Sequence, residues 1–163
     1  LFQLIKLYLR RKVRELKVEN VKINFIGRRD QLPKPVLKEM NNSENETENC
    51  TGLQLNIAVD YGGRDEILRV LNELVQEGRA HKGQFKEIDE ACFKSYSDLK
   101  NQSDPDLIIR TGGDKRLSNF MLWHAAYSEL DFIDTLWPDF NETELATALA
   151  RFNERERRFG GIG

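Results

Sequence analysis

The chain has 163 residues, of which 39% are hydrophobic and 32% are charged, and its formal net charge is -2. This length fits a single domain over residues 1–163, and the lack of a basic excess argues against nucleic acid as a partner. No run approaches the roughly 20 apolar residues of a membrane span and no signal peptide is recognisable, so we expect a cytoplasmic protein. Cys50 and Cys92 form no CxxC pair, so neither zinc nor a disulfide framework is expected.

The first third of the chain predicts a helix, a strand and a polar tract. Apolar residues recur at spacings of three and four between Phe2 and Leu16, which is typical of an amphipathic helix. Residues 21–26 alternate apolar and polar side chains, as a strand does. Residues 41–51 are rich in Asn, Glu and Ser, so we expect an exposed helix end or a mobile loop there.

The middle of the chain predicts strands that alternate with helices. Residues 53–59 alternate as a second strand, and a glycine-rich turn at residues 60–64 leads into a helix that ends near Gly78. Another helical stretch over residues 88–99 precedes the apolar run 107–109, which fits a buried parallel strand. This order predicts an α/β fold with a mainly parallel central sheet flanked by helices.

Two further helices are predicted towards the end of the chain. Phe120, Trp123 and Tyr127 recur at helical spacing, so one helix should begin just after Ser118. A strand-like apolar run follows at residues 130–133. The last helix should begin near Asn141, a favourable N-cap that is followed by a glutamate three residues on.

The loop after residues 107–109 carries a dense group of cations. It reads Arg110-Thr-Gly-Gly-Asp-Lys-Arg-Leu-Ser118, and ligands of open α/β sheets bind at the carboxyl ends of the strands. Its glycines allow positive φ, and a helix capped by Ser118 would present free N–H groups to an anion. Because arginine binds phosphate oxygens bidentately, we predict a diphosphate site at Arg110, Arg116 and Ser118. In the alternative interpretation, both arginines merely pair with surface carboxylates around a helix cap.

Glu129 is a candidate magnesium ligand. It precedes the apolar run 130–133, and Mg²⁺ is often held by one or two carboxylates together with substrate phosphates. The alternative is a solvated or capping glutamate at the boundary of an element. His124 lies on the helix predicted after Ser118, and we expect it to be structural.

Four stretches resemble the motifs of one enzyme family. They are residues 104–130, which contain the loop, Leu136-Trp-Pro-Asp-Phe140, Arg155-Glu-Arg-Arg-Phe-Gly-Gly161 and the earlier Asn56-Ile-Ala-Val-Asp-Tyr-Gly-Gly-Arg64. Together they make the chain similar, essentially from Leu1 to Gly161, to cis-prenyltransferases of the undecaprenyl diphosphate synthase type. Asp60 stands where that family commonly has Asn, and Lys115 where it often has His.

The resemblance implies an enzyme that condenses isopentenyl diphosphate with an allylic diphosphate such as farnesyl diphosphate. The product would be a long cis-polyprenyl diphosphate such as undecaprenyl diphosphate, a cell-wall lipid carrier through which the protein can associate peripherally with membranes. The resemblance assigns Arg110, Arg116 and Ser118 to the diphosphate of isopentenyl diphosphate, and Glu129 to Mg²⁺. It also implies a homodimer, in which Arg158 and Gly160 of an Arg-x-Gly tail help to complete the partner subunit's site.

One motif of the family has no match in this chain. The family's His-x-Asp-Gly-Asn-x-Arg-Trp stretch supplies a magnesium-binding Asp and the loop for the allylic diphosphate, so we expect the N-terminal part of the domain to be missing here. Two other hypotheses stay open: a non-catalytic subunit of a dimeric prenyltransferase, and a generic anion-binding α/β module. Several apolar residues are candidates for the walls of a product tunnel or for the core: Phe2, Ile5, Leu9, Leu53, Leu55 and Ile57.

Overall fold

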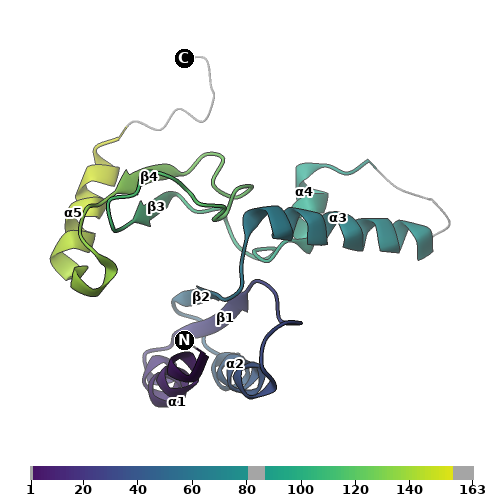
Figure 1. Ribbon diagram of the computed structural model, residues 1–163, viewed down its shortest axis with the longest axis horizontal. Helices are drawn as coiled ribbons and strands as arrows, with labels where there is room; N and C mark the ends of the chain where they lie inside the picture. The colour runs from purple at the N-terminus through teal and green to yellow at the C-terminus, as the bar shows by residue number, and fades with distance from the viewer. Residues whose placement is uncertain (1, 81–86, 156–163) are drawn as a thin grey trace. The chain divides into compact units, whose positions relative to one another are not determined.

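The computed structural model describes residues 2–80 and 87–155, and it shows an α/β protein with parallel strands (Figure 1). The predicted α/β class and the parallel strand pairing are therefore confirmed. By internal contacts the chain divides into two compact units, Leu1–Gly62 and Gly63–Gly163, and each is described by itself. The prediction of one domain over residues 1–163 stays a prediction.

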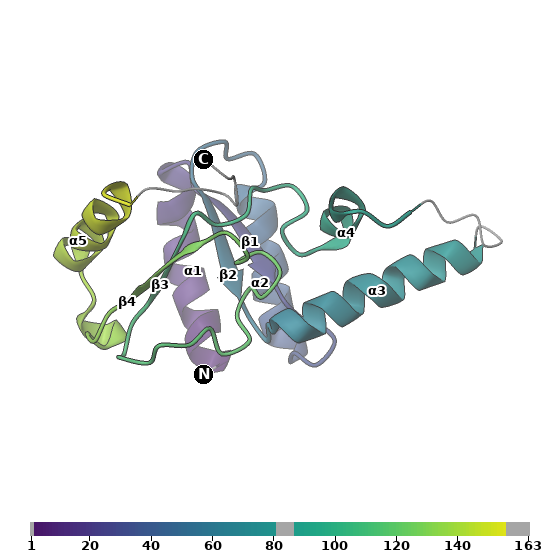
Figure 2. The ribbon, with the colours of Figure 1, turned by 90° about the horizontal axis from the view of Figure 1, so that it is seen from above.

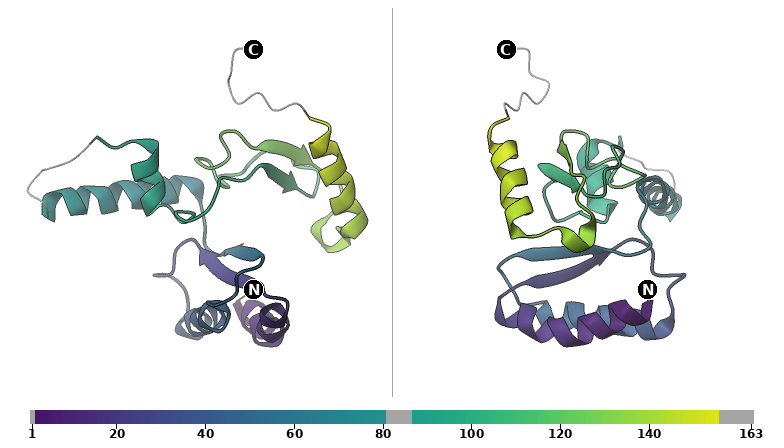
Figure 3. Two further views of the ribbon diagram at one scale, coloured as in Figure 1. Left: turned by 180° about the vertical axis from the view of Figure 1, so that it is seen from behind. Right: turned by 60° about the vertical axis from the view of Figure 1, so that its left-hand side comes forward.

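The first unit packs two helices against a two-stranded parallel sheet. Its elements are α1 (Phe2–Val18), β1 (Lys22–Ile26), α2 (Lys34–Thr47) and β2 (Gln54–Ala58). β1 pairs with β2 in a register that sets Ile23 opposite Leu55. α1 and α2 lie side by side along one face of this sheet (Figures 1 and 3). The buried core between the layers consists of Val13, Ile23, Phe25, Leu32, Val36, Met40 and Val59.

The polar tract at residues 41–51 is helical up to Thr47, and its inner side is buried rather than exposed. Thr47 Oγ1 accepts a hydrogen bond from the backbone N–H of Ile23 at 3.0 Å and donates one to the carbonyl of Ser43 at 2.8 Å. Glu44 accepts from the N–H of Phe25 at 3.0 Å. The predicted exposed helix end is therefore confirmed for the outer side of the tract, where Asn41, Asn42, Asn45 and Glu46 are exposed. The inner side is buried because Glu44 and Thr47 bind N–H groups of β1.

The second unit joins a helix pair to a second parallel strand pair. It contains α3 (Gly63–Ala80), α4 (Glu90–Tyr96), β3 (Leu107–Arg110), β4 (Glu129–Phe132), the 3₁₀ turn η1 (Trp137–Asp139) and α5 (Glu142–Asn153). α4 lies beside α3 (Figure 2), where Val70, Leu74 and Phe93 form a buried cluster. In the β3–β4 ladder Arg110 lies opposite Phe132.

The predicted N-cap of the last helix is confirmed. The side chain of Asn141 accepts hydrogen bonds from the N–H groups of Thr143 and Glu144 at 3.0 and 3.2 Å. The carboxylate of Glu144 accepts from the hydroxyl of Thr135 at 2.9 Å, which ties α5 to the segment after β4. α5 lies beside the β3–β4 ladder (Figure 3).

The helix predicted after Ser118 is absent, since residues 118–127 form turns and bends. Ser118, Asn119 and Met121 have φ values of 48°, 66° and 48°. These left-handed conformations interrupt the series of i to i−4 hydrogen bonds that a right-handed helix needs. Trp123 from this segment stacks on Phe93, with ring centroids 4.0 Å apart, so the aromatic spacing serves packing without a helix.

Candidate diphosphate-binding site

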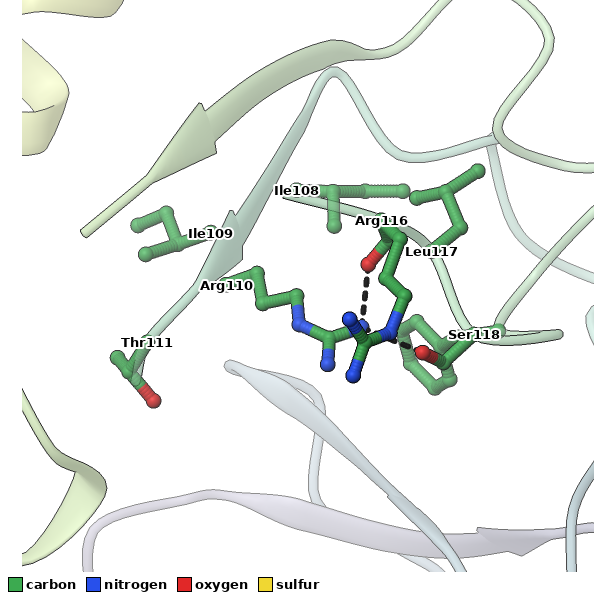
Figure 4. Close-up of a pocket in the computed structure, with 8 residues that line it drawn as sticks. Ile108, Ile109, Arg110, Thr111, Arg116, Leu117 and Ser118 are labelled. Atoms are coloured by element: carbon green, nitrogen blue, oxygen red, sulfur yellow. Dashed lines mark hydrogen bonds between the residues drawn. The ribbon is translucent and has the colours of Figure 1, made fainter. Parts of the chain in front are cut away.

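A pocket of about 350 Å³ lies at the carboxyl end of β3 (Figure 4). Arg110 is the last residue of that strand, so its side chain enters the pocket from a fixed point of the sheet. Pockets of a few hundred cubic ångströms suit small ligands. The residues that line it are Ile108, Ile109, Arg110, Thr111, Arg116, Leu117, Ser118 and Phe120.

The guanidinium of Arg110 is held by three groups of its own loop. Nη1 donates to Ser118 Oγ at 2.8 Å and to the backbone carbonyl of Arg116, as Figure 4 shows. Nη2 pairs with Asp114 Oδ2 at 2.9 Å. The structure therefore brings the three predicted residues together, but Ser118 orients Arg110 instead of capping a helix.

Arg116 forms an ion pair with the same carboxylate. Its Nη2 lies 2.6 Å from Asp114 Oδ2, the oxygen that also accepts from Arg110. The side chain of Arg116 is 65% exposed, whereas that of Arg110 is 25% exposed. Two guanidinium groups thus donate to a single carboxylate oxygen, and arginine binds phosphate oxygens by the same kind of charge-assisted hydrogen bond.

The two glycines shape the loop by their backbone. Gly112 and Gly113 have φ values of 89° and 78°, which side-chain-bearing residues rarely adopt. Their N–H groups donate to the carbonyls of Thr135 and Ile133 at 2.9 and 3.0 Å. Positive φ is as predicted, but these amides anchor the loop to the segment after β4.

Glu129 lies at the opposite end of the ladder from Arg110. It pairs with Leu107, three residues before Arg110, which is roughly 10 Å along a strand. Its Oε2 forms an ion pair with Arg155 Nη1 at 2.8 Å. A carboxylate oxygen suits Mg²⁺, but the described residues contain no group of three or more His, Cys, Asp or Glu side chains placed to hold a metal. The assignment of Glu129 to Mg²⁺ stays a prediction.

Several predicted residues are not described in full. Arg158 and Gly160 lie outside the described residues, as do the side chains of Phe2, Ile5 and Leu9. Of the remaining tunnel-or-core candidates, Leu53 is exposed, Leu55 is half-buried, and Ile57 packs against the core of the first unit.

A buried histidine bridges two carboxylates beyond the pocket. His124 is 1% exposed, and its Nε2 lies 3.1 Å from Glu66 Oε1 while its Nδ1 lies 2.9 Å from Asp104 Oδ1. Glu66 also accepts from the N–H of Asp98 at 2.9 Å, and Asp104 pairs with Lys94 at 3.1 Å. This network joins α3 and α4 to the segments before β3 and β4, which agrees with a structural role.

The network changes the pKa of His124 and of Asp104. Burial by itself lowers the pKa of His124, but the hydrogen bonds to Glu66 and Asp104 outweigh burial and raise that pKa above its ordinary value. Burial likewise raises the pKa of Asp104, and the bonds from His124 and Lys94 reverse this, so that its pKa is lowered.

Sequence reasoning missed two residues that organise the loop. The loop motif by itself assigns no role to Asp114, although its carboxylate joins both arginines. Asn119 follows Ser118 and binds the start of α3: its carbonyl accepts from the N–H of Gly63 at 2.7 Å, and its Oδ1 accepts from the N–H of Arg64 at 2.9 Å. The sequence does hold a signal for Asn119: asparagine tolerates positive φ, so an Asn directly after Ser118 indicates a turn at this point.

The fold and the pocket define an α/β protein with an arginine-lined pocket at the carboxyl end of a parallel strand. A family model described as "Putative undecaprenyl diphosphate synthase" matches residues 1–160. An isoprenyl transferase of Aquifex pyrophilus is 47% identical over 162 residues, which cover 99% of this chain and 68% of the relative. An isoprenyl transferase of Neisseria gonorrhoeae is 45% identical over 152 residues, which cover 93% of this chain and 59% of the relative.

Solved structures agree with the sequence relatives. Lavandulyl diphosphate synthase from Lavandula x intermedia, in complex with dimethylallyl diphosphate, matches with a TM-score of 0.94 at 31% identity, over 98% of this chain and 70% of that one. A probable undecaprenyl diphosphate synthase from Campylobacter jejuni matches with a TM-score of 0.86 at 32% identity, over 98% and 73%. The chain belongs to the undecaprenyl diphosphate synthase family of isoprenyl (cis-prenyl) transferases, and it spans 59 to 68% of the two curated relatives named here.

No helix in residues 2–80 and 87–155 combines the length and the apolar character that a membrane-spanning segment needs.

Proposed function

We propose that this chain forms part of a cis-prenyltransferase that condenses isopentenyl diphosphate with an allylic diphosphate such as farnesyl diphosphate. The product would be a long-chain cis-polyprenyl diphosphate such as undecaprenyl diphosphate. The observation that carries the proposal is the convergence of Arg110 and Arg116 on one oxygen position at the carboxyl end of β3. Family membership supports prenyl transfer as the chemistry.

In this reaction the two diphosphates have different fates. A bond forms between C1 of the allylic substrate and C4 of isopentenyl diphosphate, and the allylic C–O bond breaks so that its diphosphate leaves with the electron pair. A proton then leaves C2 of the isopentenyl unit. The diphosphate of isopentenyl diphosphate remains on the product, and it is this group that we assign to Arg110, Arg116 and the hydroxyl of Ser118. Pre-positioned guanidinium groups stabilise such charge without reorganising.

Mg²⁺, the homodimer and the tail belong to the same proposal. Glu129 would supply one carboxylate oxygen to Mg²⁺, which contributes charge stabilisation to diphosphate departure when bound. The described residues do not complete a metal site, so we derive no step through the ion. We further propose that Arg158 and Gly160 complete the site of the partner subunit, and that a long lipid product brings the enzyme to membrane surfaces.

The deciding experiment incubates the full-length gene product with farnesyl diphosphate, labelled isopentenyl diphosphate and Mg²⁺. We expect the label to be extracted into long-chain lipid, and chromatography of the dephosphorylated product gives its length. No label in lipid contradicts the proposal. If the same protein nevertheless raises the activity of a second prenyltransferase chain, the non-catalytic subunit becomes the correct interpretation.

A further inference from the structure

One carboxylate occupies the place between the two arginines that the proposed function gives to a phosphate oxygen. Asp114 Oδ2 lies 2.9 Å from Arg110 Nη2 and 2.6 Å from Arg116 Nη2. Because one oxygen accepts from both guanidinium groups, an incoming anion cannot take the same donors while Asp114 holds them. The loop therefore contains a negative group of its own at its binding centre.

We propose that Asp114 acts as an exchangeable counter-ion: it neutralises Arg110 and Arg116 between substrates, is displaced by the incoming diphosphate, and returns when that group leaves. The inference rests on the proposed function, because it concerns the same site.

Because the ion pair of Asp114 and Arg116 is exposed to solvent, breaking it costs little free energy. The side chains of Asp114 and Arg116 are 43% and 65% exposed, and exposed ion pairs contribute only about 0 to 1 kcal/mol. A diphosphate offers several charged oxygens to two guanidinium groups, whereas Asp114 offers one shared oxygen. The diphosphate should therefore bind the two arginines more tightly than Asp114 does, and the displaced Asp114 side chain should rotate towards the solvent.

Asp114 is not needed to aim Arg110 into the pocket. Nη1 of Arg110 is also held by Ser118 Oγ at 2.8 Å and by the carbonyl of Arg116. These contacts stay in place when Asp114 loses its charge. The effect of Asp114 on binding should accordingly be competition rather than loss of orientation.

The return of Asp114 matters because the proposed reaction is repeated. After each condensation the elongated chain carries the diphosphate that entered on isopentenyl diphosphate, so it still occupies Arg110 and Arg116. That group must leave before the next isopentenyl diphosphate can bind. If the Asp114 carboxylate pairs with the two guanidinium groups as the diphosphate of the elongated chain leaves them, the free-energy cost of its departure is lower. Successive condensations are then faster.

The first test measures the binding of inorganic diphosphate to the full-length protein by calorimetry. Asp114→Asn keeps the size of the side chain but removes its charge, so we expect binding to tighten on the order of fivefold, which corresponds to an exposed ion pair of about 1 kcal/mol. The matched control is Asp134→Asn. Asp134 lies beside Gly113: a Cβ added to Gly113 would be 3.5 Å from Asp134 Oδ1. Among the described residues, no hydrogen bond or ion pair joins Asp134 to Arg110 or Arg116.

Asp114→Asn and Asp134→Asn together show whether Asp114 competes with diphosphate for the arginines, orients them, or acts only through its negative charge. Weaker diphosphate binding by Asp114→Asn would show that Asp114 only orients the arginines, and would overturn the inference. Equal tightening by Asp114→Asn and Asp134→Asn would also overturn it, because that result reflects general loss of negative charge. This readout needs no prenyl transfer, so it succeeds or fails separately from the proposed function.

The second test measures turnover. We expect Asp114→Asn to lower the KM for isopentenyl diphosphate and to slow repeated rounds, so that shorter chains accumulate. A product distribution equal to that of the unaltered protein would contradict the returning role of Asp114.

Discussion

Arg110 and Arg116 carry the same charge but differ in how tightly the loop holds them. Arg110 is bonded to Ser118, to the carbonyl of Arg116 and to Asp114, whereas Arg116 extends into solvent and meets Asp114. A guanidinium held by three partners defines where a diphosphate binds, and a largely exposed one adds a further bond to it. We therefore expect Arg116 to contribute mainly to affinity.

Arg116→Ala should raise the KM for isopentenyl diphosphate by about 10- to 100-fold, because hydrogen bonds to charged groups are worth about 1.5 to 3 kcal/mol. Stability should change little, since the side chain is largely exposed. Steady-state kinetics measures the effect. Lys115→Ala removes the neighbouring exposed cation and serves as the control; an equal rise in KM for both variants would mean that overall loop charge, and not Arg116, sets the affinity.

Glu129 allows a test that separates a metal ligand from a structural ion pair. Glu129→Ala should raise the Mg²⁺ concentration for half-maximal activity about tenfold, as expected for the loss of one carboxylate ligand. Arg155→Ala breaks the same 2.8 Å pair but keeps the carboxylate. If a Mg²⁺ titration shows the same shift for both variants, Glu129 acts through its pair with Arg155.

At the scale of elements, buried polar contacts decide how the second unit is held together. Glu66 of α3 and Asp104 before β3 meet at His124, which belongs to the turns before β4. Because a buried charge is stable only when it is paired, the protonation of His124 should be linked to the stability of this unit.

The sign of this linkage follows from the raised pKa of His124. The native state keeps the proton to a higher pH than the unfolded state, in which the pKa is near 6.5. The contribution of His124 to the free energy of unfolding is therefore full below pH 6.5 and is lost as pH rises through the raised native pKa. The lowered pKa of Asp104 acts in the opposite direction and costs stability in acid, below its ordinary 3.8.

Urea unfolding at a series of pH values tests this linkage. His124→Gln should remove the loss of stability on the alkaline side, and His124→Leu, which places an apolar group against the buried Glu66, should cost about 3 kcal/mol. The second histidine of the chain, His81, provides the control variant His81→Gln. Parallel pH profiles for His124→Gln and the unaltered protein would exclude the linkage.

At the scale of the whole molecule, the proposed homodimer predicts that two defective chains can repair each other. Arg110→Ala removes a residue of the chain's own proposed diphosphate site, and Arg158→Ala removes the tail residue proposed to act on the partner. In a mixed dimer one site keeps its own Arg110 and receives an intact Arg158.

We therefore expect each variant alone to be nearly inactive, and an equal mixture refolded together to recover about a quarter of the activity, because half of the dimers are mixed and each has one complete site. Label incorporation measures the recovery. No recovery, with mixed dimers verified by differently tagged subunits, would place the tail in its own subunit's site.

Local patterns were sufficient for much of the fold and for part of the site. Alternating apolar residues predicted β1 and β2, the apolar run predicted β3, and Asn141 predicted the start of α5. These features depend on contacts between near neighbours in the chain. The same reasoning failed for the polar inner side of α2, whose partners are N–H groups of β1, and for residues 118–127, whose left-handed conformations follow from tertiary contacts such as that of Asn119 with α3.

The family, the cation-rich loop after β3 and the two arginines of the pocket could all be predicted from the amino-acid sequence. The pairing of acidic with basic side chains could be seen only in the folded chain. His124 meets Glu66 across 58 positions and Asp104 across 20, and Glu129 lies at the far end of the ladder from Arg110. Even Asp114, inside the motif, acquired its role from a loop bend that directs both arginines to one oxygen. Periodicity reports only which face of an element is apolar, whereas charge pairing depends on where the folded backbone brings each side chain.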